Sequence, residues 1–126
     1  MLQVVNYGVG NISAISTIFK RLGVAHGVAT TTSELKTATR IVLPGVGAFD
    51  WAMEKLNASG MRDVLDELVL NKQVPVLGIC VGMQMMAKGS EEGKLPGLKW
   101  IDAEVVRLSA LRKDEPIRLP HMGWND

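Results

Sequence analysis

The sequence predicts an α/β protein with a doubly wound, mostly parallel sheet, organised as a single domain over residues 1–126. Short apolar runs alternate along the chain with amphipathic stretches, a pattern typical of parallel strands joined by right-handed helical crossovers. Glycine-containing turns also follow directly after several of these runs. The carboxyl ends of parallel strands meet at one edge of the sheet, where ligands bind. The sequence therefore directs attention to that edge.

The first half of the chain supplies three of the predicted strands. We expect them over residues 2–6, 24–29 and 40–43. Between the first two strands, apolar residues recur at helical spacing, and Gly23 marks the end of that helix. The apolar stripe consists of Ile12, Ile15, Ile18, Phe19 and Leu22. Residues 30–33 can cap a short helix over residues 34–38.

In the second half, helices are predicted over residues 48–56 and 61–70, with a break near residues 57–60. Residues 74–79 form an apolar run that predicts a buried fourth strand, followed by a helix over residues 81–88. The pattern then changes. Residues 89–96 form a polar loop, residues 100–108 resemble a strand, and residues 111–116 form a charged turn. The predicted fold is thus incomplete at its carboxyl end.

Composition excludes several classes of function. A net charge of +1 gives no reason to expect nucleic acid or an anionic membrane as a partner. No apolar run approaches the length of a membrane span, and the first residues predict a strand rather than a signal peptide. One cysteine cannot form an internal disulfide, which favours a cytoplasmic location. With one cysteine and two histidines, a structural zinc site is not expected, and no cofactor is predicted.

The only cysteine, Cys80, stands at the end of the predicted fourth strand. Gly78 and Gly82 flank it two residues away on either side, giving Gly-x-Cys-x-Gly. This is the thiol version of a nucleophile elbow, a tight strand-to-helix turn that exposes one side chain above the sheet. Glycine is required because a Cβ would collide with neighbouring backbone. An inert core cysteine is the alternative interpretation of a lone cysteine in an apolar run.

A second turn of interest, Pro-Gly-Val-Gly over residues 44–47, follows the third predicted strand. Its backbone N–H groups could stabilise an oxyanion, together with the N–H of Val81 after the cysteine. A plain surface turn is the alternative. Residues 8–13 follow a strand and open a helix, but they lack the third glycine of a dinucleotide-binding loop.

Four segments together resemble the class I (triad) glutamine amidotransferase family, and within it the glutaminase subunits of imidazole glycerol phosphate synthase. They are residues 6–11, 43–49, 78–84 and 120–125, with weaker matches at residues 90–93 and 96–98. The elbow alone marks the broad amidotransferase class. The Pro-Gly-Val-Gly and His-Met-Gly-Trp-Asn segments favour the glutaminase subunit. The resemblance implies the family's sheet, which has a flavodoxin-like core.

The resemblance also implies roles for individual residues. Cys80 would attack the side-chain amide of glutamine, forming a glutamyl thioester and releasing ammonia. Val46 and Val81 would donate N–H groups to the tetrahedral oxyanion. Contacts to the bound glutamine would come from Gly45, Gly47 and Gln84.

A partner subunit is implied as well. Ammonia would pass to a (β/α)₈-barrel cyclase that makes imidazole glycerol phosphate and aminoimidazole carboxamide ribotide in histidine biosynthesis. Asn11, Met122 and Trp124 would belong to the face that meets this partner. For Met122 and Trp124, a place in the core is the alternative.

The chain departs from the family pattern in two respects. The family usually has an acidic residue where this chain has Asn6. Its catalytic base is a histidine in a His-x-Glu-type segment that would lie beyond residue 126. Neither His26 nor His121 matches that segment, and His26 is expected to be a satisfied or surface histidine. We therefore expect a fragment that is inactive by itself.

Three other functions remain open from the sequence. A paralogous protein could deliver ammonia to another acceptor, such as a nucleotide-linked sugar. A non-catalytic remnant could keep only the partner-binding face. A flavodoxin-like or receiver-type module would share the sheet, but no acidic cluster follows the first strand and no clear phosphate loop is present.

Overall fold

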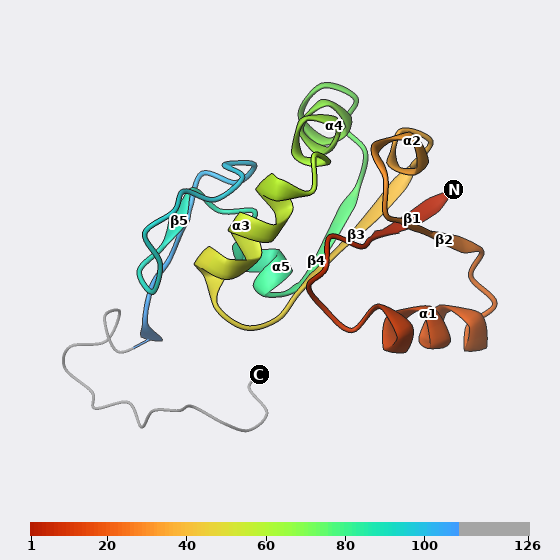
Figure 1. Ribbon diagram of the computed structural model, residues 1–126, viewed down its shortest axis with the longest axis horizontal. Helices are drawn as coiled ribbons and strands as arrows, with labels where there is room; N and C mark the ends of the chain where they lie inside the picture. The colour runs from red at the N-terminus through yellow and green to blue at the C-terminus, as the bar shows by residue number, and fades with distance from the viewer. Residues whose placement is uncertain (109–126) are drawn as a thin grey trace.

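The computed structural model describes residues 1–108, which are organised around a four-stranded parallel sheet (Figure 1). Its strands are β1 (Leu2–Val5), β2 (His26–Ala29), β3 (Arg40–Gly45) and β4 (Val76–Cys80), in the order β2-β1-β3-β4. Each neighbouring pair is parallel. The predicted doubly wound sheet is thus confirmed, and β3 extends two residues further than expected.

Helices connect the strands and begin where local chemistry favours them. They are α1 (Ile12–Arg21), α2 (Thr32–Leu35), α3 (Phe49–Ala58), α4 (Arg62–Asp66) and α5 (Val81–Gln84), with a π-helical segment η1 (Glu67–Asn71). Asn11 caps α1, because its Oδ1 accepts a hydrogen bond of 3.1 Å from Ala14 N. Thr31 caps α2 in the same way through Glu34 N. The cap of α2 therefore lies within the threonine-rich turn that the sequence indicated.

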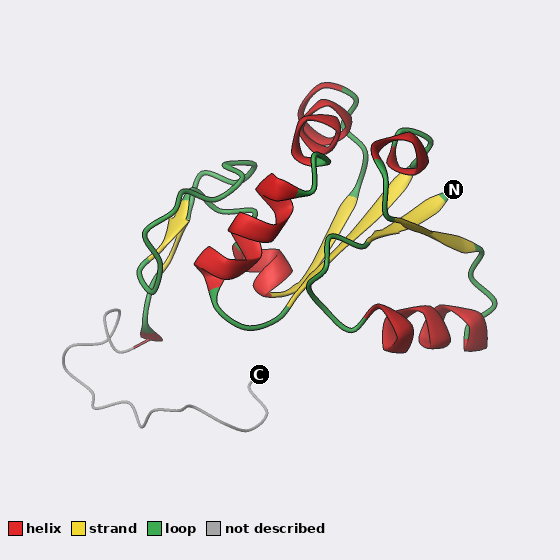
Figure 2. Ribbon diagram, viewed as in Figure 1, coloured by secondary structure: helices red, strands yellow, loops and turns green. Residues whose placement is uncertain are grey.

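The two faces of the sheet are covered unequally. Figure 2 shows α1 on one side of the strands and α2 and α4 on the other. Residues such as Val5 and Leu43 join the main core with Leu35 of α2, Phe49 of α3 and Leu65 of α4. None of the residues of α1 is buried. The main hydrophobic core thus lies on the face opposite α1.

The prediction that the fourth strand is buried is wrong. In the sheet that residues 1–108 form, β4 is an edge strand, and its Leu77 and Ile79 side chains are 57% and 37% exposed. These side chains share a face with Val4 and Val42, because residues in register on parallel strands point the same way. That is the face on which α1 lies, and α1 packs near β2 at the far edge. An apolar run shows that a strand can be buried, but it does not show which element covers it.

Two further elements are shorter than predicted. The helix expected over residues 81–88 ends at Gln84, because the following backbone pairs with the returning chain: Leu98 N donates to Met85 O at 2.7 Å. Gly97 allows this approach, since a Cβ there would lie 2.1 Å from Ala87 O. The strand expected over residues 100–108 reduces to β6 (Glu104–Val105), which pairs in parallel with β5 (Gly89–Ser90). Within residues 1–108, no helix is long and apolar enough to cross a membrane.

Pro44 lies inside a central strand, which is unusual because proline has no N–H to donate. Its register explains the placement. The pairing of β1 with β3 ends at Val42, whereas the pairing of β4 with β3 continues to Gly45. Ile41 N donates toward the β4 side, to Pro75 O, so the N–H groups of even-numbered β3 residues point toward β1. Pro44 therefore lacks an N–H only on the side where the pairing of β3 with β1 has already ended.

Candidate active site

Cys80 occupies a strained elbow between β4 and α5. Its backbone dihedrals are φ 57° and ψ −125°, a region that L-residues other than glycine rarely adopt. Such conformations cost about 1–3 kcal/mol and occur mainly at functional sites. The thiol is free and exposed. The alternative of an inert core cysteine is therefore excluded.

Three glycines allow the elbow to pack against β3. A Cβ on Gly82 would lie 2.0 Å from Leu43 O, and one on Gly78 would lie 2.6 Å from the Cα of Met83. A Cβ on Gly45 would lie 2.6 Å from Gly82 N. Real Cβ atoms do not approach backbone atoms this closely. The sequence prediction that Gly78 and Gly82 are needed for steric reasons is thus confirmed, and Gly45 has the same role on the facing strand.

The elbow lies directly beside the turn that was predicted to stabilise an oxyanion. Gly45 and Cys80 are partners in the register of β3 and β4. Val46 and Gly47 follow on the exposed edge, and Gly47 has a φ of +81°. We call residues 45–47 the oxyanion loop, after the role that the sequence analysis predicts for them. Val81 begins α5, and the first N–H groups of a helix have no acceptor within it.

Tyr7 fixes the start of the oxyanion loop, a role that the sequence analysis missed. Its hydroxyl donates a hydrogen bond of 2.6 Å to Pro44 O and lies 3.3 Å from Met85 Sδ. The side chain is buried, and this burial raises the pKa of the Tyr7 hydroxyl above its usual value. The only sequence feature that could have indicated this role is the position of the chain's single tyrosine, directly after the first predicted strand.

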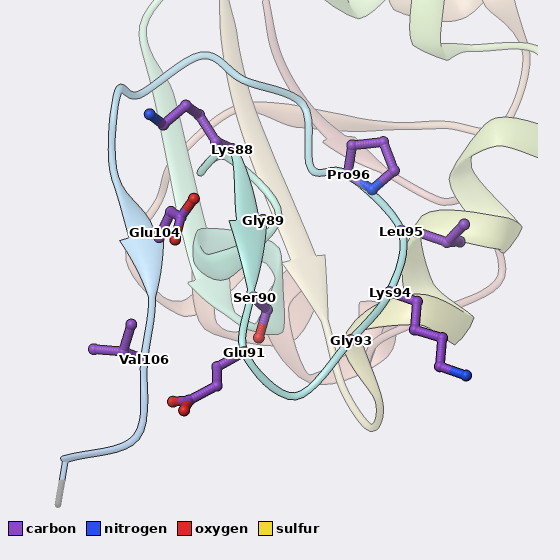
Figure 3. A pocket seen from close by; sticks show the side chains of 10 residues that line it. All are labelled: Lys88, Gly89, Ser90, Glu91, Gly93, Lys94, Leu95, Pro96, Glu104 and Val106. Atoms are coloured by element: carbon purple, nitrogen blue, oxygen red, sulfur yellow. The ribbon is translucent and has the colours of Figure 1, made fainter. Parts of the chain in front are cut away.

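Gln84, a predicted substrate contact, lines a cavity of about 180 Å³ together with residues of the β5 and β6 region. Ser90, Glu92 and Arg107 lie on the same wall, so the cavity has carboxylate, hydroxyl and guanidinium groups around it. A separate cavity of about 510 Å³ lies along β5, with Lys88, Lys94 and Glu104 among its lining residues, and Figure 3 shows these side chains. Cys80 does not line either cavity. The smaller cavity meets α5 only through Gln84.

The remaining predicted residues are placed as follows. Asn11 is exposed as the cap of α1, and Asn6 Nδ2 lies 3.5 Å from Thr30 Oγ1. His26 is satisfied, as expected: its Nε2 lies 2.7 Å from Ser16 Oγ, and its Nδ1 lies 3.0 Å from Val24 O. Met122 and Trp124, and with them His121, lie outside the described residues. Among residues 1–108, no three His, Cys, Asp or Glu side chains are grouped to hold a metal ion.

A nucleophile-type elbow beside a glycine-rich loop, at one edge of a parallel sheet, is the feature to compare with known protein families. The profile described as "Glutamine amidotransferase class-I" matches residues 3–125. The chain belongs to the class I glutamine amidotransferase family.

The individual relatives are more specific. Over all of this chain, a protein of Bdellovibrio bacteriovorus named imidazole glycerol phosphate synthase subunit HisH is 55% identical. A protein of Pseudomonas aeruginosa named HisH 2 of the same synthase is 46% identical over 99% of the chain. The chain covers 62% and 60% of these two relatives, respectively, so it spans about three fifths of their length.

A solved structure supports the fold independently. A crystal structure of a glutamine amidotransferase superposes with a TM-score of 0.71, at 22% sequence identity, over 83% of this chain and 56% of the other. At that identity, the likeness concerns the fold alone.

Proposed function

We propose that this chain supplies the nucleophile, the oxyanion donors and part of the glutamine pocket of a glutaminase. The observation that carries the proposal is the exposed, strained Cys80, which lies opposite Gly45 in the strand register. A cysteine held at positive φ at a strand-to-helix turn is typical of a nucleophile elbow. Membership of the amidotransferase family gives this elbow its substrate, the side-chain amide of glutamine.

The proposed reaction uses these groups in succession. The sulfur of Cys80, as the thiolate, attacks the amide carbon of glutamine, and the carbonyl electrons move to oxygen. The N–H groups of Val46 and Val81 stabilise the resulting oxyanion. The intermediate collapses by breaking the C–N bond, and the nitrogen leaves as ammonia after it accepts a proton. Water then hydrolyses the glutamyl thioester to glutamate and regenerates the thiol.

The names of the relatives extend the proposal to the fate of the ammonia. We propose that ammonia passes to a (β/α)₈-barrel cyclase subunit, which makes imidazole glycerol phosphate and aminoimidazole carboxamide ribotide in the cytoplasm. Asn11, Met122 and Trp124 would meet this partner. Gly47 and Gln84 would hold the glutamine. The relatives named as subunits of this synthase support this acceptor over a nucleotide-linked sugar.

Labelling of Cys80 tests the proposal on the chain as it stands. The protein is incubated with the chloromethyl ketone analogue of glutamine or with iodoacetamide, and adducts are followed by mass spectrometry. The ratio of the two rates is divided by the same ratio for glutathione. We expect a normalised ratio well above one and no adduct in Cys80→Ser. Glutamine should slow the labelling of Cys80, whereas glutamine derivatives with a bulky group on the side-chain amide should not. A ratio near one, or labelling that glutamine does not slow, would contradict the proposal.

Turnover is expected to be negligible in this chain alone. Removing the general base of a nucleophilic triad lowers the rate by on the order of 10³-fold or more, and neither histidine of the chain matches that base by its motif. The measurement is ammonia release from glutamine by a coupled assay. Release at a rate ordinary for an enzyme, on the order of 10 per second, would show that another group serves as the base.

A further inference from the structure

Two carboxylates connect the start of α3 to the loop that follows α5. Asp50 accepts hydrogen bonds from Lys94 N, at 3.0 and 2.9 Å to its two oxygens, and from Leu95 N at 2.9 Å. In the opposite direction, Glu92 Oε1 accepts a hydrogen bond of 3.0 Å from Phe49 N. We call this reciprocal pair of contacts the carboxylate clasp. Figure 3 shows the segment from Gly93 to Leu95 running alongside the ribbon of α3.

The clasp replaces a cap that α3 lacks. Ala48 stands at the N-cap position of α3 and has no side chain that can accept a hydrogen bond. Glu92, which lies 43 residues further along the chain, accepts the bond from the first N–H of the helix instead. Gly93 is needed at the contact, since a Cβ there would lie 2.4 Å from Asp50 Oδ1. The hydrogen bonds from Lys94 and Leu95 hold the pKa of the Asp50 carboxyl below its usual range, so the acceptor is ionised at neutral pH.

The position of the clasp relates it to the oxyanion loop. The upstream end of that loop is fixed by the contact of Tyr7 with Pro44 and by the packing of Gly45 on Gly82. Val46, Gly47 and Ala48 are exposed, and they have no equivalent buried anchor. The first fixed point downstream is Phe49, which is buried and whose N–H enters the clasp.

We infer that Asp50 is a positioning residue for the oxyanion loop. The Asp50 carboxylate holds residues 94 and 95 on the first turn of α3. Glu92, in the same loop, is thereby kept in place to accept the hydrogen bond from Phe49 N, the point at which the oxyanion loop ends. This inference rests on the proposed function. Donor groups must lie within a fraction of an ångström of their working position, and a displacement of about 1 Å can lower a rate by about 10²-fold.

The chloromethyl ketone and iodoacetamide measure this effect separately. The carbonyl of the ketone uses the oxyanion donors, whereas iodoacetamide reports mainly on the reactivity and access of the thiol. In Asp50→Ala, we expect the rate with the ketone to fall by at least about tenfold, equivalent to about 1.4 kcal/mol. The rate with iodoacetamide should stay within about twofold. Asp50→Asn keeps one acceptor oxygen and should restore part of the lost rate.

Asp63→Ala is the matched control. Asp63 is the second residue of α4, as Asp50 is the second residue of α3, and it is exposed. Asp63→Ala should leave the labelling rates with the ketone and with iodoacetamide unchanged. Gly93→Ala provides a second route to the same effect, because it breaks the clasp without removing a carboxylate. Circular dichroism verifies that each variant is folded at the assay temperature.

The outcomes separate the inference from the function on which it rests. If the unaltered chain shows no preference for the ketone, the proposed function fails and the inference fails with it. If the unaltered chain prefers the ketone and Asp50→Ala keeps that preference, the inference alone is overturned. It is also overturned if both rates fall in parallel in Asp50→Ala and Gly93→Ala, because that result means a general loss of structure. A selective fall in both variants supports it.

Discussion

The tight contact between Gly82 and β3 makes Gly82→Ala an informative perturbation. The added Cβ would lie 2.0 Å from Leu43 O and 2.8 Å from the carbonyl carbons of Leu43 and Pro44. All three are backbone atoms of a central strand, so α5 must move away by about 1.4 Å for the added Cβ to reach even the 3.4 Å at which ordinary contact with Leu43 O begins. Overpacking of this kind costs typically about 1–3 kcal/mol. The same shift displaces Cys80 and Val81 from the oxyanion loop.

Two measurements follow from this displacement. Denaturant unfolding should show a free energy lower by about 1–3 kcal/mol in Gly82→Ala, at an unchanged slope. Labelling of Cys80 by the chloromethyl ketone should fall by about 10²-fold or more, because the elbow moves by more than about 1 Å. Gly89→Ala is the control, since a Cβ at Gly89 meets nothing within 4 Å. Values for Gly82→Ala that equal those of Gly89→Ala would refute the close-packing argument.

Three further substitutions test other parts of the structure. Because burial raises the Tyr7 pKa, the folded state keeps a proton that the unfolded chain releases above about pH 10. The resulting contribution to the free energy of unfolding is complete below that pH. Above it, the contribution is lost at about 1.4 kcal/mol per pH unit. Tyr7→Phe should therefore lose less stability than the unaltered chain when the pH rises from 9 to about 11, as measured by urea unfolding. If the stability of both proteins falls equally with pH, the argument is contradicted. Gln3 is 7% exposed, and its Oε1 has no hydrogen-bond partner. Gln3→Met should therefore raise the free energy of unfolding by about 1 kcal/mol. A lower free energy of unfolding in Gln3→Met would show that this oxygen is satisfied in the folded protein. At the strained elbow, Cys80→Gly should be more stable than Cys80→Ala by about 1 kcal/mol, because only glycine adopts positive φ without a penalty; equal thermal midpoints would argue against strain.

The sequence was sufficient to predict the parts of the site that depend on local geometry. Gly78 and Gly82 around Cys80 predicted a turn in which no Cβ is tolerated, and the calculated contacts agree. The alternation of strands and helices predicted a parallel sheet, which in turn placed Cys80 and residues 44–47 at one edge. The roles of Val46 and Val81 as oxyanion donors stay predictions, because they depend on the bound substrate.

What the sequence did not predict depends on contacts between distant segments. The helix after Cys80 ends early because Met85 pairs with Leu98, and no local signal marks that pairing. The clasp joins Asp50 to Lys94 across 44 residues, so neither residue indicates it alone. The exposure of Leu77 depends on which face of the sheet α1 covers, and strand composition contains no information on that arrangement.

Within residues 1–108, the edge position of β4 has a consequence for how the elbow opens. Amide hydrogens at the margin of a sheet exchange with solvent through small local openings, whereas those of a central strand such as β1 require much larger ones. Cys80 therefore belongs to one of the least protected strands of the described fold. Mild heating or low denaturant should open β4 and disorder the elbow while the central strands remain intact, so that selective labelling of Cys80 by the chloromethyl ketone is lost before global unfolding.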